Sequence, residues 1–315
     1  MFNMELLKKE IEMLEAEIKR EADAEYAIKE AAIAREIEMG RLKEEEMIEF
    51  LKNLNISKET LEKTNEEVEK ISIKALEETE KLEGTPDEVL INEIEQLQNM
   101  QALGISSIMA NVELGIQSHW WGSASPYYCC GSIHKHNEGG ITNGGYSCPK
   151  YAISSNRMHP WVYAKGDGLL GYTDDNDVTV YNTLYFAYWP TGYEVVRPRA
   201  WVSIHGYYGI YSNDKWWNHR WAKIKLDIGI NVYQNYWVGA KWINIKNRSN
   251  DNINERGRID RYTTIEANPL TVGPNKWVII TVTTKLRVES EGRNAWGKLS
   301  FTGSDFISAS MIAIR

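Results

Sequence analysis

Two stretches of the chain alternate between apolar and polar residues, and this alternation restricts the fold more than any other feature. In KIKLDIGINVY, residues 223–233, every second residue from position 224 is Ile, Leu or Val. The stretch WVIITVTTKLRVE, residues 277–289, repeats the pattern. Successive side chains of a β-strand point to opposite faces. Each stretch therefore predicts an antiparallel strand that is buried on one face and exposed on the other.

Further strands are expected in the same half of the chain, separated by turn signals such as YWPTGY and NRSNDN. They fall at about 178–188, 199–211, 237–246, 258–266, 296–302 and 305–314. Since no helical period separates them, the strands favour packed antiparallel sheets over alternating strands and helices. We therefore predict an antiparallel β-sandwich, jelly-roll-like in type, for the aromatic half of the chain.

The first hundred residues carry a different pattern, in which apolar residues recur at helical spacing. Four of them follow alternating steps of four and three and so share one helical face: Leu7, Ile11, Leu14 and Ile18. The same register later meets charged residues, so a strict heptad does not continue. Turn signals in NLNISKET and EGTPDEV separate three expected helices, at about 4–53, 58–82 and 86–117. Packed against one another, these helices would form a helical hairpin, a bundle or a coiled coil.

Composition divides the chain at the same place. All 12 Trp and 16 of the 17 Tyr lie beyond residue 119. Residues 1–100 hold 14 Lys and Arg against 28 Asp and Glu, whereas the remainder holds 22 against 16. The predicted fold class is therefore α+β and multi-domain. Its parts are an acidic helical domain for oligomerisation or attachment at 1–118, a Gly-, aromatic- and Cys-rich junction at 119–160, and a Trp- and Tyr-rich β-sandwich at 161–315.

Cysteine and histidine residues gather in the junction, which begins with HWWGSASPYYCCGSIHKHNEGG, residues 119–140. Unpaired thiols are one interpretation, and a disulfide from either of the adjacent cysteines to the third is another. Zinc is a third, since four Cys and His ligands suit a tetrahedral ion, although the spacing matches no standard zinc motif. The candidate residues are Cys129, Cys130, Cys148, His134 and His136. We expect no cofactor.

Aromatic side chains in the predicted sandwich suggest a binding surface. The segment AWVSIHGYYGIY, residues 200–211, turns its aromatic set outward if Val202 and Ile204 are buried. Together with KWWNHRW, residues 215–221, this set would form a platform on which sugar rings stack while His and Arg bind the hydroxyls. The alternative is that the same rings fill a core or a subunit interface. The predicted ligand-binding residues are Trp201, His205, Tyr207, Trp216, Trp217, His219, Arg220 and Trp221.

Residues 100–121, MQALGISSIMANVELGIQSHWW, are mostly apolar or small and carry one charge, in Glu113. The apolar part is shorter than the roughly 20 residues that span a bilayer, so we expect a buried helix that docks on the β-domain. An inserting amphipathic segment is the alternative. Its membrane-insertion candidates are Ile105, Ile108, Trp120 and Trp121.

The sequence supports neither catalysis nor nucleic-acid binding. It contains no phosphate-binding Gly-rich loop, no G-x-S-x-G elbow and no H-E-x-x-H helix, so we predict that the protein is not an enzyme. Basic residues are scattered along the chain, and nucleic acid is not an expected partner. The N-terminus carries no signal peptide pattern. We expect synthesis in the cytoplasm, with an extracellular site reached only after lysis or by non-classical export.

Two functional hypotheses follow. The first is a non-enzymatic, homo-oligomeric structural or surface-binding protein, an adhesin-like stalk of helices. Its β-sandwich head recognises a cell-surface glycan or packs into a larger assembly. The alternative is a pore-forming or membrane-lytic toxin, in which residues 100–121 insert and the sandwich binds the receptor. Only this alternative requires a membrane partner.

Overall fold

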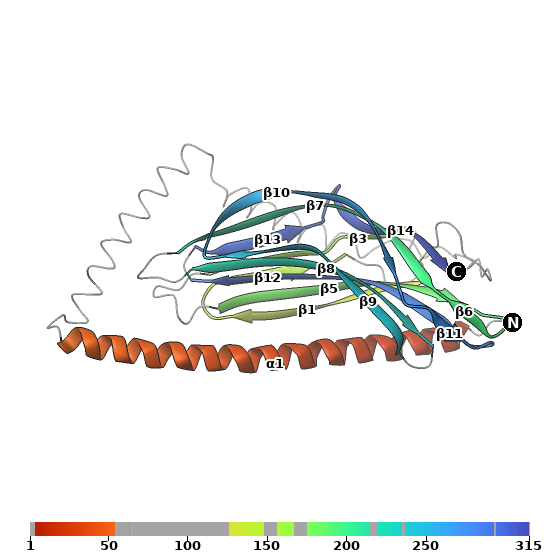
Figure 1. Cartoon of the computed structure of the whole chain (residues 1–315), viewed down its shortest axis with the longest axis horizontal. Coiled ribbons are helices and arrows are strands. Elements are labelled where there is room, and N and C mark those ends of the chain that lie inside the picture. The colour runs from red at the N-terminus through yellow and green to blue at the C-terminus, as the bar shows by residue number, and fades with distance from the viewer. Residues whose placement is uncertain are drawn as a thin grey trace. The chain divides into compact units, whose positions relative to one another are not determined.

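The computed structural model describes residues 4–53, 63, 126–147, 156–166, 175–214, 220–234, 237–292 and 294–314 (Figure 1). The chain forms two compact units. The first comprises Met1–Ile33 with Ile108–Arg315, and the second comprises Ala34–Ser107. Helix α1 (Met4–Asn53) begins in the first unit and ends in the second. The fold and the site described below belong to the first unit.

One layer of the first unit is a five-stranded antiparallel sheet (Figure 1). Its order is β1 (Tyr128–Asn137), β5 (Asp175–Tyr188), β12 (Val278–Glu291), β8 (Trp221–Tyr233) and β9 (Trp237–Asn250). The two alternating stretches become β8 and β12, which pair directly, with Leu226 opposite Leu286. Both leucines are fully buried, so the predicted apolar face of each strand is the inner face of the sheet.

The other layer is a seven-stranded antiparallel sheet centred on the long strand β7 (Pro198–Asn213). One edge of β7 pairs with β13 (Trp296–Ser300) and β14 (Phe306–Ile314), and the other edge pairs with β10 (Asn252–Glu266). The remaining strands are β2 (Ile141–Gly145), β3 (Arg157–Met158) and β4 (Trp161–Lys165). Two short strands, β6 (Glu194–Val196) and β11 (Leu270–Val272), form a separate ribbon.

The apolar inner faces of the two sheets pack against each other and form the main core. The closeness of this packing is clear at Gly297 of β13. A Cβ atom there would come 2.6 Å from the Cγ1 atom of Val288, on β12 of the opposite sheet. Each fully buried Leu, Ile or Val contributes about 1.5–3 kcal/mol to the free energy of unfolding. This dense apolar contact, extended over both sheets, holds the sandwich together.

Helix α1 packs its apolar stripe onto the outer face of the five-stranded sheet. Leu7, Ile11 and Leu14 are almost fully buried, in a second cluster that includes Tyr185 of β5 and Trp277. A hydrogen bond fixes the same contact, because the Tyr128 hydroxyl donates to Glu15 at 2.5 Å. The stripe therefore meets a sheet rather than another helix.

This contact corrects the predicted fold class. The described residues are mainly antiparallel sheet with a single long helix, so the prediction of an N-terminal helical hairpin, bundle or coiled coil is wrong. Helical periodicity identifies a face that must be buried, but it carries no information about what buries it. The helices expected at 58–82 and 86–117 lie outside the described residues, apart from residue 63. No described helix is long and apolar enough to cross a membrane.

Residues 128–145, which were expected to join two domains, form strands of the sandwich itself. Strand β1 pairs with β5 in one sheet, and β2 pairs with β4 in the other. Glycine permits this tight approach at Gly131, where a Cβ atom would lie 2.5 Å from the carbonyl oxygen of Tyr181. The glycines of this segment thus serve close strand packing as well as turns.

Candidate functional site

The outer face of the five-stranded sheet carries rows of polar and aromatic side chains that the strand register brings side by side. Alternation sends every second residue of each strand to this face, and antiparallel pairing aligns them across the strands. One row, from β1 to β9, consists of Ser132, Tyr181, Lys285, Asp227 and Asn244. The next row consists of Cys130, Thr183, Thr283, Gly229 and Trp242.

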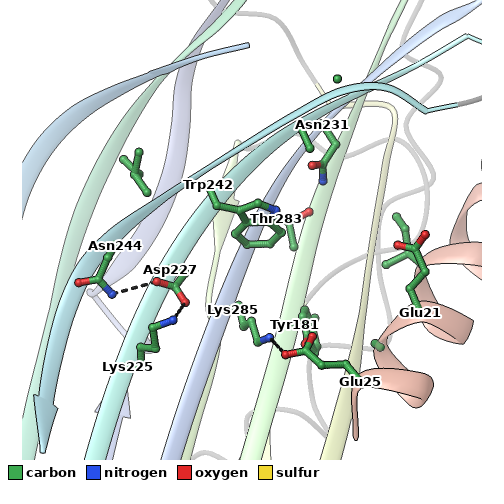
Figure 2. Close-up of a pocket in the computed structure, with 15 residues that line it drawn as sticks. Glu21, Glu25, Tyr181, Lys225, Asp227, Asn231, Trp242, Asn244, Thr283 and Lys285 are labelled. Carbon is green, nitrogen blue, oxygen red and sulfur yellow. Dashed lines mark hydrogen bonds and ion pairs between the residues drawn. The ribbon is translucent and has the colours of Figure 1, made fainter. Parts of the chain in front are cut away.

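A groove of about 860 Å³ opens between these rows and helix α1 (Figure 2). Its volume lies within the usual range for a small-molecule site, about 300–1,000 Å³. The helix forms one wall with Ile18, Glu21, Ala22 and Glu25, and β9 forms the other with Gly239, Ala240, Trp242, Ile243 and Asn244. The floor consists of Tyr181, Lys225, Asp227, Asn231, Thr283 and Lys285. All of these residues belong to the first compact unit.

Trp242 supplies the large aromatic surface of the groove. Its side chain is 43% exposed, which is unusual for an indole in a sheet. Opposite it on β8 is Gly229, and a Cβ atom there would meet three ring atoms at 2.7–2.8 Å. Nearly equal distances to three ring atoms mean that the ring faces the glycine. The indole therefore lies across β8 with one face toward the strand and its other surface available to the groove.

Asp227 organises the polar floor beside this ring. Its carboxylate accepts a hydrogen bond from the Asn244 Nδ2 at 2.9 Å and forms an ion pair with Lys225 at 2.8 Å. A β-bulge in β9 contributes to this arrangement, because Asn244 pairs with Asp227 while Lys246 pairs with the preceding Leu226. A bulge re-aims the side chains next to it. A carboxylate has about four acceptor positions, so Asp227 retains the capacity to accept from a ligand.

The Glu25 side chain extends from helix α1 to Lys285 and Tyr181 of the sheet, on the helix side of the groove (Figure 2). Its carboxylate receives a hydrogen bond from the Lys285 Nζ at 2.5 Å and one from the Tyr181 hydroxyl at 3.2 Å. Burial raises the pKa of Glu25, but the hydrogen bond and charge of Lys285 and the bond from Tyr181 outweigh it, and the pKa is lowered overall. Burial, with the nearby Glu25, raises the pKa of Tyr181, which keeps its hydroxyl a donor.

His134 of β1 forms a second polar contact with the helix. Its Nδ1 lies 3.6 Å from the Asp23 carboxylate, and its ring packs against Tyr26 at 5.5 Å between centroids. Burial lowers the pKa of His134, an effect that the Asp23 charge partly opposes. The imidazole is therefore held mainly neutral against the helix near neutral pH.

The Cys and His residues of the predicted metal site that the structure describes do not converge. Cys129 is disulfide-bonded, and the Cys130 Sγ donates to the Tyr185 hydroxyl at 3.3 Å. His134 is four residues beyond Cys130 on the same strand, a separation of about 13 Å at the rise of an extended chain. His136 instead contacts Glu138 at 3.1 Å. Within the described residues no three His, Cys, Asp or Glu side chains are grouped to hold a metal ion, and Cys148 lies outside those residues.

The residues of the predicted aromatic platform are divided between the two sheets. Trp201, His205 and Tyr207 lie on the outer face of β7 in the seven-stranded sheet, where the His205 Nδ1 contacts Asp260 at 3.1 Å. Trp221 starts β8 of the other sheet, and alternation places it on that sheet's outer face. The structure therefore does not join Trp221 to the β7 aromatics. Arg220 is buried, and Trp216, Trp217 and His219 lie outside the described residues.

Prediction from the sequence missed the groove, although part of its signal was present. The alternation in 223–233 already turned Lys225 and Asp227 outward, and that in 277–289 did the same for Lys285. What was missing was the pairing that aligns these positions with Trp242. The insertion candidates Ile105, Ile108, Trp120 and Trp121 lie outside the described residues.

No family model matches the chain, and no curated protein matches it either. The structure of TmCBM61 in complex with β-1,4-galactotriose is 14% identical, with 56% of this chain and 88% of that chain covered and a TM-score of 0.20. The CBM22-1 xylan-binding domain of Paenibacillus barcinonensis Xyn10C is 10% identical, with 61% of this chain and 97% of that chain covered and a TM-score of 0.14. The isomalto-dextranase of Arthrobacter globiformis T6 complexed with panose is 9% identical, with 56% of this chain and 33% of that chain covered and a TM-score of 0.18. TM-scores this low do not indicate a shared function.

Proposed function

We propose that the groove between α1 and the five-stranded sheet binds a glycan, and that the protein is a non-enzymatic surface-binding protein. The observation that carries this proposal is the exposed indole of Trp242 beside a floor of amide, hydroxyl and charged groups. A sugar ring has an apolar C–H face, which stacks on an aromatic ring, and a rim of hydroxyls, which needs donors and acceptors close by. The groove offers both within one cavity.

The polar groups of the floor are suited to bind hydroxyls in a fixed orientation. Asp227 is held by Lys225 and Asn244, and the Asn231 Nδ2 contacts the Thr281 hydroxyl at 3.3 Å. Side chains that are already positioned by neighbours lose little further conformational freedom when a ligand binds. A preorganised floor of this kind gives selectivity among sugars that differ in hydroxyl geometry.

Binding without catalysis fits the carboxylates of the groove better than glycoside hydrolysis does. A glycosidase needs one carboxyl group whose pKa is raised so that it donates a proton. The pKa of Glu25 is lowered instead, and Asp227 is ion-paired with Lys225. Glu25 is thus stabilised in the charged form and Asp227 is engaged by Lys225, which favours a role of these two side chains in holding a ligand.

The test compares tryptophans on opposite outer faces of the sandwich. A glycan array identifies a ligand, and isothermal titration calorimetry then measures its affinity for wild type, Trp242→Ala and Trp201→Ala. We expect Trp242→Ala to weaken binding at least tenfold and Trp201→Ala to leave it unchanged. Weaker binding by Trp201→Ala with unchanged binding by Trp242→Ala would place the site on the outer face of β7 instead. Failure of the wild-type protein to bind any glycan would refute the proposal.

Other parts of the sequence-based hypothesis stay predictions. Self-association through the acidic helices is checked by light scattering on the purified chain. The disulfide at Cys129 supports an oxidising final location, since disulfides persist mainly outside the cytosol. The toxin alternative depends on residues 100–121, which lie outside the described residues, and dye leakage from liposomes tests it.

A further inference from the structure

One carboxylate of helix α1 is bound by side chains of the sheet rather than by its own helix. The Lys285 Nζ lies 2.5 Å from the Glu25 Oε1, and the Tyr181 hydroxyl lies 3.2 Å from the Glu25 Oε2. Both carboxylate oxygens are therefore engaged, each by a different strand. This is the geometry by which an ammonium and a phenol bind a carboxylate.

The two donors form a fixed receptor, whereas the carboxylate is on a more exposed side chain. Tyr181 and Lys285 are directly paired residues on β5 and β12, in the interior of the five-stranded sheet. The Lys285 side chain is 18% exposed and that of Glu25 is 61% exposed. An exposed ion pair of this kind is weak and is screened by salt. The receptor is thus more firmly placed than its occupant.

The receptor opens into the same groove as the aromatic ring. Lys285 lies in the row of Asp227 and Asn244, one row away from Trp242. Two strand spacings separate β12 from β9, a distance of about 10 Å across the sheet. A sugar that stacks on Trp242 would therefore direct a neighbouring sugar of the same chain toward Lys285 and Tyr181.

We propose that Lys285 and Tyr181 form a carboxylate subsite of the groove, which binds the acid group of a uronic-acid residue and which Glu25 occupies in the absence of ligand. The inference rests on the proposed glycan-binding function and specifies its ligand class. Glu25 acts as an internal competitor, because a ligand carboxylate and the Glu25 carboxylate need the same two donors. Binding of an acidic glycan then releases Glu25 from the sheet.

The charges around the subsite allow this exchange. Arg287, on the same face of β12, is already paired with Glu289 and, at 3.4 Å, with Asp177. Asp227, the nearest acid on β8, is neutralised by Lys225. Loss of the Glu25 contact therefore leaves the Lys285 ammonium to attract an anionic group.

The experiment uses the full chain and two oligosaccharides of equal length and linkage, an oligogalacturonide and its fully methyl-esterified, neutral form. Calorimetry measures both affinities for wild type, Glu25→Gln, Lys285→Met and the control Glu17→Gln, which lies on the same helix beside Arg20. We expect Glu25→Gln to raise the affinity for the acidic ligand severalfold and Lys285→Met to abolish the preference for it. Both variants should change the affinity for the acidic ligand relative to that for the neutral one, and Glu17→Gln should behave as wild type.

The outcomes separate the two proposals. Binding of the neutral ligand with no advantage for the acidic one in any variant would overturn the carboxylate subsite and leave the glycan groove standing. No binding of any glycan to any variant, with circular dichroism confirming that each is folded, would overturn both. An unchanged preference in Lys285→Met would also reject the subsite, because the ammonium would then play no part in recognition.

Discussion

Trp242 of β9 stands opposite Gly229 of β8, and its indole ring occupies the space that a side chain at position 229 would take. The absence of a side chain at Gly229 lets the ring lie over the strand and remain 43% exposed in the groove. The glycine is thus part of the proposed binding surface, although it has no group that contacts a ligand.

A methyl group at position 229 is therefore expected to displace the indole. Gly229→Ala should lower glycan affinity about tenfold, or ~1.4 kcal/mol, because the stacking surface is tilted away from the floor. The ring is a side chain and can move, so the fold should survive. Calorimetry measures the loss of affinity, and tryptophan fluorescence measures the displacement of the indole. Gly192→Ala, where a Cβ atom meets nothing within 4 Å, is the matched control, and equal affinities of the two variants would contradict the assignment.

Helix α1 is held to the sheet mainly by its buried stripe. Ile11→Asp places a charge in an apolar contact and should release the start of the helix while the two sheets stay folded. Hydrogen exchange measured by mass spectrometry should show loss of protection in residues 4–26 and unchanged protection in β5 and β12. Met13→Asp, at a position that is 58% exposed on the same helix, should have no effect. Unfolding of the whole first unit by Ile11→Asp would show instead that the sandwich depends on the helix.

Acidification is expected to weaken the contact between α1 and the sheet near His134 and Glu25 and to leave the contact near Glu10 intact. The pKa of His134 is lowered in the folded protein, so its contribution is complete above about pH 6.5 and is lost as the pH falls through the folded value. The pKa of Glu25 is also lowered, so the Lys285 contact weakens below about pH 4.5. Burial raises the pKa of Glu10, despite the opposing charge of Lys276, so protonation favours the contact there.

Hydrogen exchange of helix α1, measured from pH 7 to pH 4 and corrected for the intrinsic rate, distinguishes the end near His134 and Glu25 from the end near Glu10. Exchange should rise in residues 18–26 and change little in residues 4–14. The groups that face His134 are Asp23, Lys19 and Glu25 on α1 and Lys285 on β12. A His134→Gln variant should remove the step that begins below about pH 6.5 and keep the one that begins below about pH 4.5. An equal rise in exchange in residues 4–14 and 18–26 would contradict the assignment of the effect to His134 and Glu25.

The main core should respond to truncation independently of the groove. Leu226 is fully buried on the inner face of β8, and Leu226→Ala is expected to lower the free energy of unfolding by about 2–5 kcal/mol. Urea denaturation measures the change. Lys241→Ala, at an exposed position of β9, should shift it by less than about 0.5 kcal/mol. Similar values for both variants would mean that the two sheets do not share a packed core.

The local patterns of the sequence predicted much of the sandwich and the orientation of its side chains. Alternation in 223–233 and 277–289 indicated that Leu226 is buried and that Asp227 and Lys285 face outward, and the structure agrees. The same kind of reasoning identified the apolar stripe of the first helix. These features follow from the periods of a strand and a helix, which involve only residues close together in the chain.

Only the tertiary structure decided what each face meets. The stripe of α1 packs on a sheet and not on another helix, since periodicity leaves the partner undefined. The groove likewise depends on strand order, which places β9 beside β8 and β8 beside β12. Trp242, Asp227, Lys285 and Glu25 become neighbours through this pairing and through the docking of the helix. Such contacts join residues far apart in the chain, and they are set by the packing of whole elements, which no local pattern encodes.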